Sequence, residues 1–266
     1  MKKKKKSKSK NIVIIIVLIL FLLLLVVVGK LYTSIKSYKI DSRIATLEKF
    51  KKDNPNYDTV AWLKVEGTNI DYPVITEQDA IEYNDGDIQF LWQVGEMDKL
   101  NRVNTILGHN VMNLSKNPLV TEKKHVRFEQ LMSFTYLDFA KKNEYIQLTI
   151  DGKDYLFKIF GISYIDKKEV STYNNASDGD EYVNQIIEQD KKYSIFDYKA
   201  DVNEKDTLIS LITCTRMFDQ YDKGNFRVDA RLVREGENTS HYKVEKNKNY
   251  KEVEEQMKGE IEDDNA

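Results

Sequence analysis

A run of seventeen consecutive apolar residues, from Ile12 to Val28, constrains this chain more than any other sequence feature. With about 1.5 Å of rise per residue, a helix of this length is just long enough to cross a hydrocarbon core about 30 Å thick. Seven lysines and no acidic residue stand in the preceding segment, 1–10. Lysine excess on one side of a span favours the cytoplasm for that side. The sequence therefore predicts a basic cytoplasmic arm (1–10), a single transmembrane anchor (11–30) and an extracellular remainder.

A cleaved signal peptide is the alternative interpretation of this segment. The apolar region of a signal peptide is normally shorter and ends in a small-residue cleavage site. Here the run ends in Val26-Val27-Val28-Gly29-Lys30, which offers no such site. The pattern favours an anchor that stays on the protein.

Charge and cysteine content exclude several classes of protein. Eight of the 41 basic residues and none of the 43 acidic residues lie in the first thirty positions, so the remainder carries a net charge of −10. An acidic exported part argues against nucleic-acid binding. The single cysteine, Cys214, excludes an internal disulfide and a cysteine-rich zinc site. No carboxylate cluster demands a metal, and no cofactor is expected.

The rest of the chain divides into a folded body (36–234) and a polar tail (235–266). The tail combines low hydrophobicity with high charge, a composition typical of disorder, and we expect it to be disordered. Within the body, short apolar runs separated by turn residues predict many strands with a few helices between them. The fold class is therefore expected to be mostly β with interspersed helices.

Three local patterns in the body are clear. Ile40, Ile44, Leu47 and Phe50 recur at helical spacing and predict an amphipathic helix just outside the membrane. Residues 145–150 and 155–162 flank a turn, Asp151-Gly152-Lys153-Asp154, and predict a hairpin. A helix is predicted over 178–190.

Cys214 is the first candidate for chemistry. Free cysteine is usually a small buried core residue, and that interpretation stays open. However, Cys214 ends an apolar strand predicted over 207–213 and is followed by polar residues, Thr215 and Arg216. A strand end that faces a loop is a common place for a nucleophile.

His109 is the second candidate. Among the three histidines, it alone ends a predicted strand (104–107), between Gly108 and Asn110. A structural histidine is the alternative. A cysteine and a histidine far apart in sequence can meet in the fold, and this pairing is usual for a cysteine nucleophile.

An arginine would complete such a site. Attack on an amide creates an oxyanion, which needs a positive group or N–H donors nearby. The candidates are Arg216, Arg227 and Arg231, and surface solvation is the alternative for each. Arg227 and Arg231 share one face of the next strand because side chains alternate with a period of two.

These residues together resemble the sortase family, and specifically class B sortases. Residues 210–214, Ser-Leu-Ile-Thr-Cys, are close to the Thr-Leu-x-Thr-Cys strand of the family. Residues 106–110, Ile-Leu-Gly-His-Asn, match the strand and Gly-His-Asn that carry the family histidine. Weaker similarity over 54–75 and 127–152 extends the resemblance to about residues 40–234. It implies a sortase-like β-barrel, preceded here by the amphipathic helix and the transmembrane helix.

The resemblance implies a membrane-anchored cysteine transpeptidase on the outside of a Gram-positive bacterium. Such an enzyme cuts a C-terminal sorting signal of a secreted protein and passes the acyl group to an amine of a peptidoglycan precursor or a pilin lysine. Cys214 would form the thioester, His109 would transfer protons, and Arg227 would stabilise the oxyanion. The residues expected to contact the substrate lie beside these on the same strands: Asn110, Ser210, Thr213 and Thr215.

One position departs from the family pattern. When Ala230-Arg231-Leu232 is aligned with the family's terminal segment, Asn225 stands where the essential arginine is expected. Arg227 lies two residues further on and on the same strand face, so a small shift would let it serve, and it is preferred to Arg216. Two alternative functions stay open: a cell-wall cysteine peptidase or amidase, and a catalytically degenerate, membrane-tethered scaffold.

Overall fold

The structure is a computed structural model. It describes seven stretches of the chain: residues 3–34, 38–76, 91–93, 99–110, 128–166, 179–215 and 224–250. The chain divides into two compact units, one of residues 1–38 and 238–241 and one of residues 39–237 and 242–266. Each unit is described by itself.

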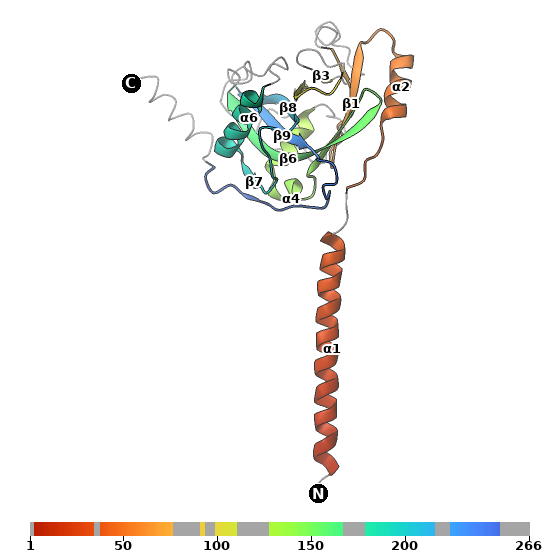
Figure 1. Cartoon of the computed structure of the whole chain (residues 1–266), viewed down its shortest axis with the longest axis vertical. Coiled ribbons are helices and arrows are strands. Elements are labelled where there is room, and N and C mark those ends of the chain that lie inside the picture. The colour runs from red at the N-terminus through yellow and green to blue at the C-terminus, as the bar shows by residue number, and fades with distance from the viewer. Residues whose placement is uncertain are drawn as a thin grey trace, which may run out of the picture. The chain divides into compact units, whose positions relative to one another are not determined.

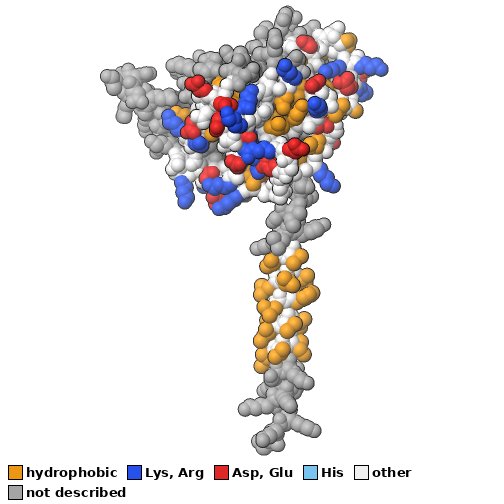
Figure 2. Space-filling view, in the orientation of Figure 1, with side chains coloured by type: hydrophobic (Ala, Val, Ile, Leu, Met, Phe, Trp, Pro, Cys, Tyr) orange, Lys and Arg blue, Asp and Glu red, His pale blue; other side chains and the backbone are white. Residues whose placement is uncertain are grey.

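The first unit contains one long helix, α1 (Lys3–Ser34). All seventeen apolar side chains from Ile12 to Val28 are more than half exposed, and they form a continuous apolar sleeve around the helix (Figure 2). Such a surface indicates association with a membrane. The described part of the chain nevertheless holds no helix with the length and apolar content of a membrane span. The prediction of an anchor over 11–30 is therefore supported as membrane association, and the transmembrane span itself stays a prediction.

The second unit is built around a closed barrel of eight strands in the order β1-β2-β3-β4-β8-β9-β6-β5 (Figure 1). Two pairs, β2 with β3 and β4 with β8, are parallel, and the other pairs are antiparallel. The strands are β1 (Thr59–Val65), β2 (Asp71–Ile75), β3 (Leu91–Gln93), β4 (Val103–Leu107), β5 (Tyr145–Ile150), β6 (Lys153–Asp166), β8 (Leu208–Thr215) and β9 (Gly224–Leu232). The mostly β fold with helices that the sequence predicts is confirmed.

In the described residues of this unit, four helices accompany the barrel: α2 (Ile44–Asp53), the 3₁₀ helix η1 (Phe128–Thr135), α4 (Leu137–Ala140) and α6 (Asp180–Tyr193). The helix α6 has acidic residues in its first turn and lysines in its last turn, which complements the helix dipole. Its buried residues Val183, Ile186 and Ile187 face the outside of the barrel, where they pack with Val103 and Leu208. The helix predicted from Ile40 begins four residues later than that apolar spacing suggests.

The hairpin of β5 and β6 is tighter than the sequence predicts. Lys153 already pairs with Ile150, which leaves only Asp151 and Gly152 in the turn. Both residues have positive φ, 50° and 66°, as a two-residue type I′ turn requires. The four-residue turn predicted over 151–154 was therefore wrong by two residues.

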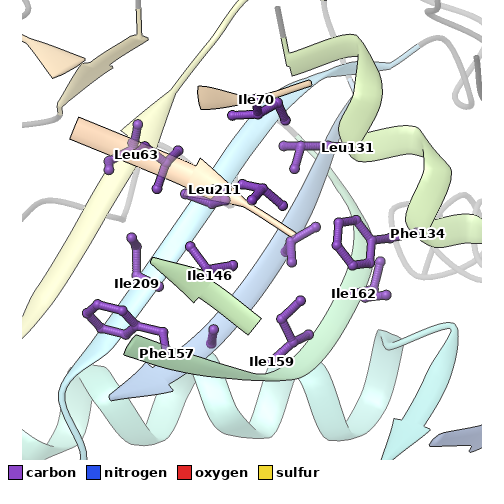
Figure 3. Close-up of a cluster of buried hydrophobic side chains, with 14 of the residues drawn as sticks. Leu63, Ile70, Leu131, Phe134, Ile146, Phe157, Ile159, Ile162, Ile209 and Leu211 are labelled. Carbon is purple, nitrogen blue, oxygen red and sulfur yellow. The ribbon is translucent and has the colours of Figure 1, made fainter. Parts of the chain in front are cut away.

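The main core fills the barrel, and strand alternation determines which side chains enter it (Figure 3). On β8, Ile209 and Leu211 belong to this core, whereas Leu208 belongs to the cluster beneath α6. On β9, Phe226 and Val228 belong to the core. Because successive side chains point to opposite faces, one set of alternating residues on these strands lies on the outer face. That set is Ser210, Ile212 and Cys214 on β8, and Asn225, Arg227, Asp229 and Arg231 on β9.

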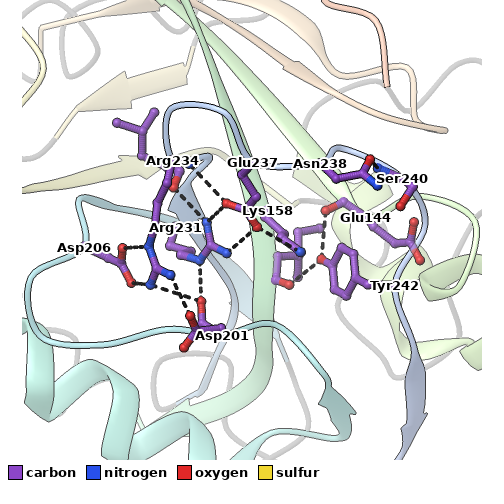
Figure 4. A network of polar contacts seen from close by, with 12 residues as sticks. Glu144, Lys158, Asp201, Asp206, Arg231, Arg234, Glu237, Asn238, Ser240 and Tyr242 are labelled. Atoms are coloured by element: carbon purple, nitrogen blue, oxygen red, sulfur yellow. Dashed lines mark hydrogen bonds and ion pairs between the residues drawn. The ribbon is translucent and has the colours of Figure 1, made fainter. Parts of the chain in front are cut away.

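The prediction of a disordered tail is wrong for residues 242–250. Residues Val244–Lys246 form β10, which pairs with β7 (Phe196–Tyr198), and Val244 is buried in the main core. The Tyr242 hydroxyl donates hydrogen bonds to the carbonyl oxygens of Glu144, at 3.1 Å, and Ile159 (Figure 4). Averaged composition hides these single buried residues among charged neighbours. The remainder of the predicted tail, 251–266, lies outside the described residues.

Candidate active site

The ends of β4 and β8 lie side by side because the two strands pair in parallel. Leu107 is in register with Ile212, and the amide of Gly108 donates to the Ile212 carbonyl at 3.2 Å. Two side-chain bonds extend the pairing beyond the strands. The Thr213 hydroxyl donates to the Gly108 carbonyl at 2.7 Å, and the Asn110 amide Nδ2 donates to the Cys214 carbonyl at 3.1 Å.

These bonds place His109 beside Cys214. The β4–β8 register ends at Leu107 and Ile212, and the bonds from Gly108 and Asn110 to the Ile212 and Cys214 carbonyls hold His109 next to the end of β8. His109 is exposed and Cys214 is half-buried, so reagents in solvent can reach both groups. The structure therefore brings together the two catalytic candidates, which stand 105 positions apart in the chain.

The four predicted substrate contacts are all buried: Asn110, Ser210, Thr213 and Thr215. Asn110 and Thr213 make the two bonds that join the strand ends. The Ser210 hydroxyl donates to Asp229 on β9. In this structure these three side chains position the strands that carry the site.

The neighbouring strand β9 brings two polar residues toward the thiol. Cys214 is in register with Asn225, and Ile212 is in register with Arg227. Arg227 therefore shares the outer face with Cys214 but lies two residue pairs further from the strand end. Its side chain is 0% exposed and extends beneath α6, where Nη1 donates to Gln189 at 2.9 Å and Nη2 donates to Asp190 at 3.1 Å. Arg216, the other arginine candidate, lies outside the described residues.

Arg227 belongs to a buried network that sequence reasoning missed. Its Nε forms an ion pair with Asp229, and the Ser163 hydroxyl donates to Asp190 at 2.7 Å. Burial raises the pKa of Asp229 well above its ordinary value; the Arg227 charge opposes this shift, and the Asp190 charge adds to it. The alternation of Arg227, Asp229 and Arg231 signals a polar outer face on β9. Nothing in the sequence identifies α6 as its cover.

Metal ligands are not gathered near this site. Over the described stretches, no three histidine, cysteine, aspartate or glutamate side chains are grouped so that they could hold a metal ion. The chemistry available here is that of a thiol, an imidazole and neutral hydrogen-bond donors. This set suits acyl transfer through a covalent thioester.

The comparisons with known proteins agree with this geometry. The family described as the sortase domain matches residues 63–234. Sortase B of Staphylococcus aureus is 22% identical over 177 residues, which cover 63% of this chain and 68% of that protein. The structure of Clostridium perfringens sortase B aligns with a TM-score of 0.53 at 24% identity, over 70% of this chain and 99% of that one. A Streptococcus pyogenes class B sortase involved in pilus biogenesis aligns with a TM-score of 0.55 at 17% identity, over 72% of this chain and 100% of that one.

The matched domain covers more than half of the chain, so this chain belongs to the sortase family of cysteine transpeptidases. Its matches in sequence and in structure are to class B sortases.

Proposed function

We propose that this protein is a membrane-anchored extracellular transpeptidase that cleaves a C-terminal sorting signal of secreted proteins and transfers the new carboxyl end to an amine. The observation that supports the proposal is that Gly108 and Asn110, on either side of His109, are hydrogen-bonded to residues 212–214 at the end of the strand that carries Cys214. The acceptor would be the amine of a peptidoglycan precursor or a pilin lysine.

In the first half-reaction, the Cys214 thiolate attacks the scissile carbonyl carbon. A C–S bond forms, and the π electron pair moves to the oxygen to give an oxyanion. When that intermediate collapses, the C–N bond breaks and the leaving amine takes a proton from the His109 imidazolium. The product is a thioester on Cys214.

In the second half-reaction, the acceptor amine attacks the thioester and neutral His109 removes its proton. The C–N bond forms, the C–S bond breaks and the thiolate returns. Both oxyanions need a hydrogen-bond donor close to the thiol. Strand β9 offers two polar side chains for this role, Arg227, which the sequence proposes, and Asn225.

The exposed apolar surface of α1 supports the membrane-anchored part of the proposal. With residues 1–10 in the cytoplasm, residues 36–234 would lie outside the cell. An anchored enzyme and membrane-retained substrates share one thin layer, which raises their effective concentration. We therefore propose that the anchor contributes to the rate as well as to the location.

Mass spectrometry of the products tests the proposal. The full chain, purified in detergent, is incubated with a library of sorting-signal peptides, with and without an amine acceptor. A transpeptidase gives an amine-dependent ligation product, whereas a cysteine peptidase or amidase gives the same free acid with or without the amine. Cys214→Ala should abolish both products, and the surface variant Lys191→Ala should retain them. Equal activity in Cys214→Ala would eliminate the proposal, and the absence of product from both wild type and Cys214→Ala would favour a tethered scaffold.

A further inference from the structure

Cys214 lies between two polar residues on neighbouring strands. Strand β8 runs between β4 and β9 in the barrel, with His109 just beyond the end of β4 and Asn225 near the start of β9. Asn225 is the residue directly opposite Cys214 in the β8–β9 register. The Cα atoms of directly opposite residues lie about 4.5–5.5 Å apart, with both side chains on the same face. Histidine and asparagine thus flank the thiol from opposite sides.

The surroundings of Asn225 leave its carboxamide available. The residue is only 7% exposed, and its other neighbour across the sheet is the apolar Ile165. Its side chain makes no hydrogen bond to any other residue that the structure describes. The polar atoms of this side chain are not fully buried, so its carboxamide can donate to a group that arrives with the substrate.

Arg227 is in the opposite situation. Its guanidinium pairs with two carboxylates, Asp190 and Asp229, and is fully buried. If the guanidinium moved to the thiol, the buried Asp190 carboxylate would lose its cationic partner inside the protein. Removal of one partner from a buried ion pair is strongly unfavourable. The Arg227 side chain is therefore held between the outer face of β9 and α6.

We propose that Asn225 is the hydrogen-bond donor at the thiol, in the place where the family pattern leads one to expect arginine. This inference rests on the proposed function. The Asn225 Nδ2–H donates to the thiolate in the resting enzyme and to the oxyanion that forms when the C–S bond is made. A neutral amide stabilises that charge by dipole and hydrogen bond alone. Asn225 does not orient the imidazole, because Cys214 separates it from His109.

The single cysteine allows a direct test that needs no substrate. The pH dependence of iodoacetamide alkylation is measured for the full chain in detergent, where Cys214 is the only thiol. Removal of a donor from the thiolate in Asn225→Ala should move the midpoint of the profile to higher pH. Asn225→Asp, which also adds a negative charge, should move it further. The matched control is Asn249→Ala, an exposed asparagine after β10, which should leave the midpoint in place.

Kinetics with the peptide identified in the library screen give the second readout. Asn225→Ala should lower kcat/KM by on the order of 10²-fold, mostly through kcat, the range for loss of one oxyanion donor. Asn225→Leu has nearly the shape of asparagine without its donors and serves if the alanine variant does not fold. Melting temperatures of the variants are compared with wild type.

The outcomes separate this inference from the proposed function. If folded Asn225→Ala and Asn225→Leu retain the wild-type alkylation midpoint and kcat/KM while Cys214→Ala is inactive, the protein is a Cys214-dependent enzyme and Asn225 is not the hydrogen-bond donor at its thiol. If Cys214→Ala turns over the peptide as fast as wild type, the proposed function itself is wrong. A shifted midpoint together with a lower kcat supports the assignment.

Discussion

Arg227 and Asp190 join the barrel to the helix that covers it: their Nη2 and Oδ1 atoms lie 3.1 Å apart, with side-chain exposures of 0% and 3%. The arginine comes from β9 and the aspartate from the last turns of α6 (Figure 1). Asp229 completes the network from the strand side. In the β8–β9 register, Arg227 lies two residue pairs from the Cys214–Asn225 pair, so the α6 contact and the candidate site share one strand.

The first prediction concerns this ion pair. Arg227→Met leaves the buried Asp190 carboxylate without its cation and should lower the free energy of unfolding by about 3–5 kcal/mol. Urea unfolding of the purified chain measures the loss. The control is Lys191→Met on the same helix, whose exposed pair with Glu188 should contribute nothing measurable. If Arg227→Met kept wild-type stability, the guanidinium would be free to serve at the thiol.

The second prediction is a dependence of stability on pH. Burial raises the pKa of Asp229, so the folded chain keeps a proton that the unfolded chain releases above the ordinary value near 4. The folded state then binds more protons, and the free energy of unfolding falls as pH rises from about 4 toward the raised pKa. Asp229→Asn has no proton to lose and should flatten this decline. Urea midpoints across the pH range measure both curves.

Glu237 provides a control of opposite sign for this prediction. Hydrogen bonds from Arg231 lower the pKa of Glu237 to about 2. Its contribution is therefore present above the ordinary value of 4.5 and is lost as pH falls toward 2. Glu237→Gln should remove the loss of stability at acid pH. It should leave unchanged the fall in the free energy of unfolding that Asp229 causes as pH rises above about 4. A neutral-range decline that persists in Asp229→Asn would assign it to another group.

The third prediction tests how closely α6 approaches the sheet. A Cβ added at Gly161 would lie 2.0 Å from Oδ2 of Asp190, a carboxylate fixed by Ser163 and Arg227. Gly161→Ala should therefore push the helix outward and cost about 1–3 kcal/mol, as overpacking does. Gly179→Ala, at the N-cap of α6, meets no heavy atom of the described residues closer than 3.9 Å and should cost less, about 0.5–1 kcal/mol of stability, because alanine caps a helix less well than glycine. Thermal melting compares the two, and equal melting temperatures would contradict the close approach.

The sequence could identify the parts of the candidate site that depend on short runs of consecutive residues. The strands that end at His109 and Cys214 are apolar runs followed by polar residues, and the structure places both ends together. The partners of Arg227 could not be predicted, because Asp190 lies 37 positions away on a helix whose docking depends on the whole fold. The register between β8 and β9 could not be predicted from the sequence either. The alignment drew attention to Asn225, but only the β8–β9 pairing places it opposite the thiol.

The tail was misread for a different physical reason. Average composition reports how much apolar surface a segment can bury, and residues 235–266 have little. Two side chains are enough here, because Tyr242 and Val244 enter an existing core and β10 pairs with an existing strand. A segment that completes another domain does not need a core of its own.

The last prediction follows from those two side chains. A chain that ends at Glu237 loses the buried side chain of Val244, which contributes about 1.5–3 kcal/mol, and the partly buried side chain of Tyr242 with the hydrogen bonds of its hydroxyl. A chain that ends at Tyr250 retains these contacts and should unfold like the full-length protein. Within the full chain, Tyr242→Phe should show the loss of the hydroxyl bonds alone, and the exposed Lys243→Ala should show none. If the chain ending at Glu237 melted at the wild-type temperature, the pairing of β10 with β7 would contribute nothing to the fold.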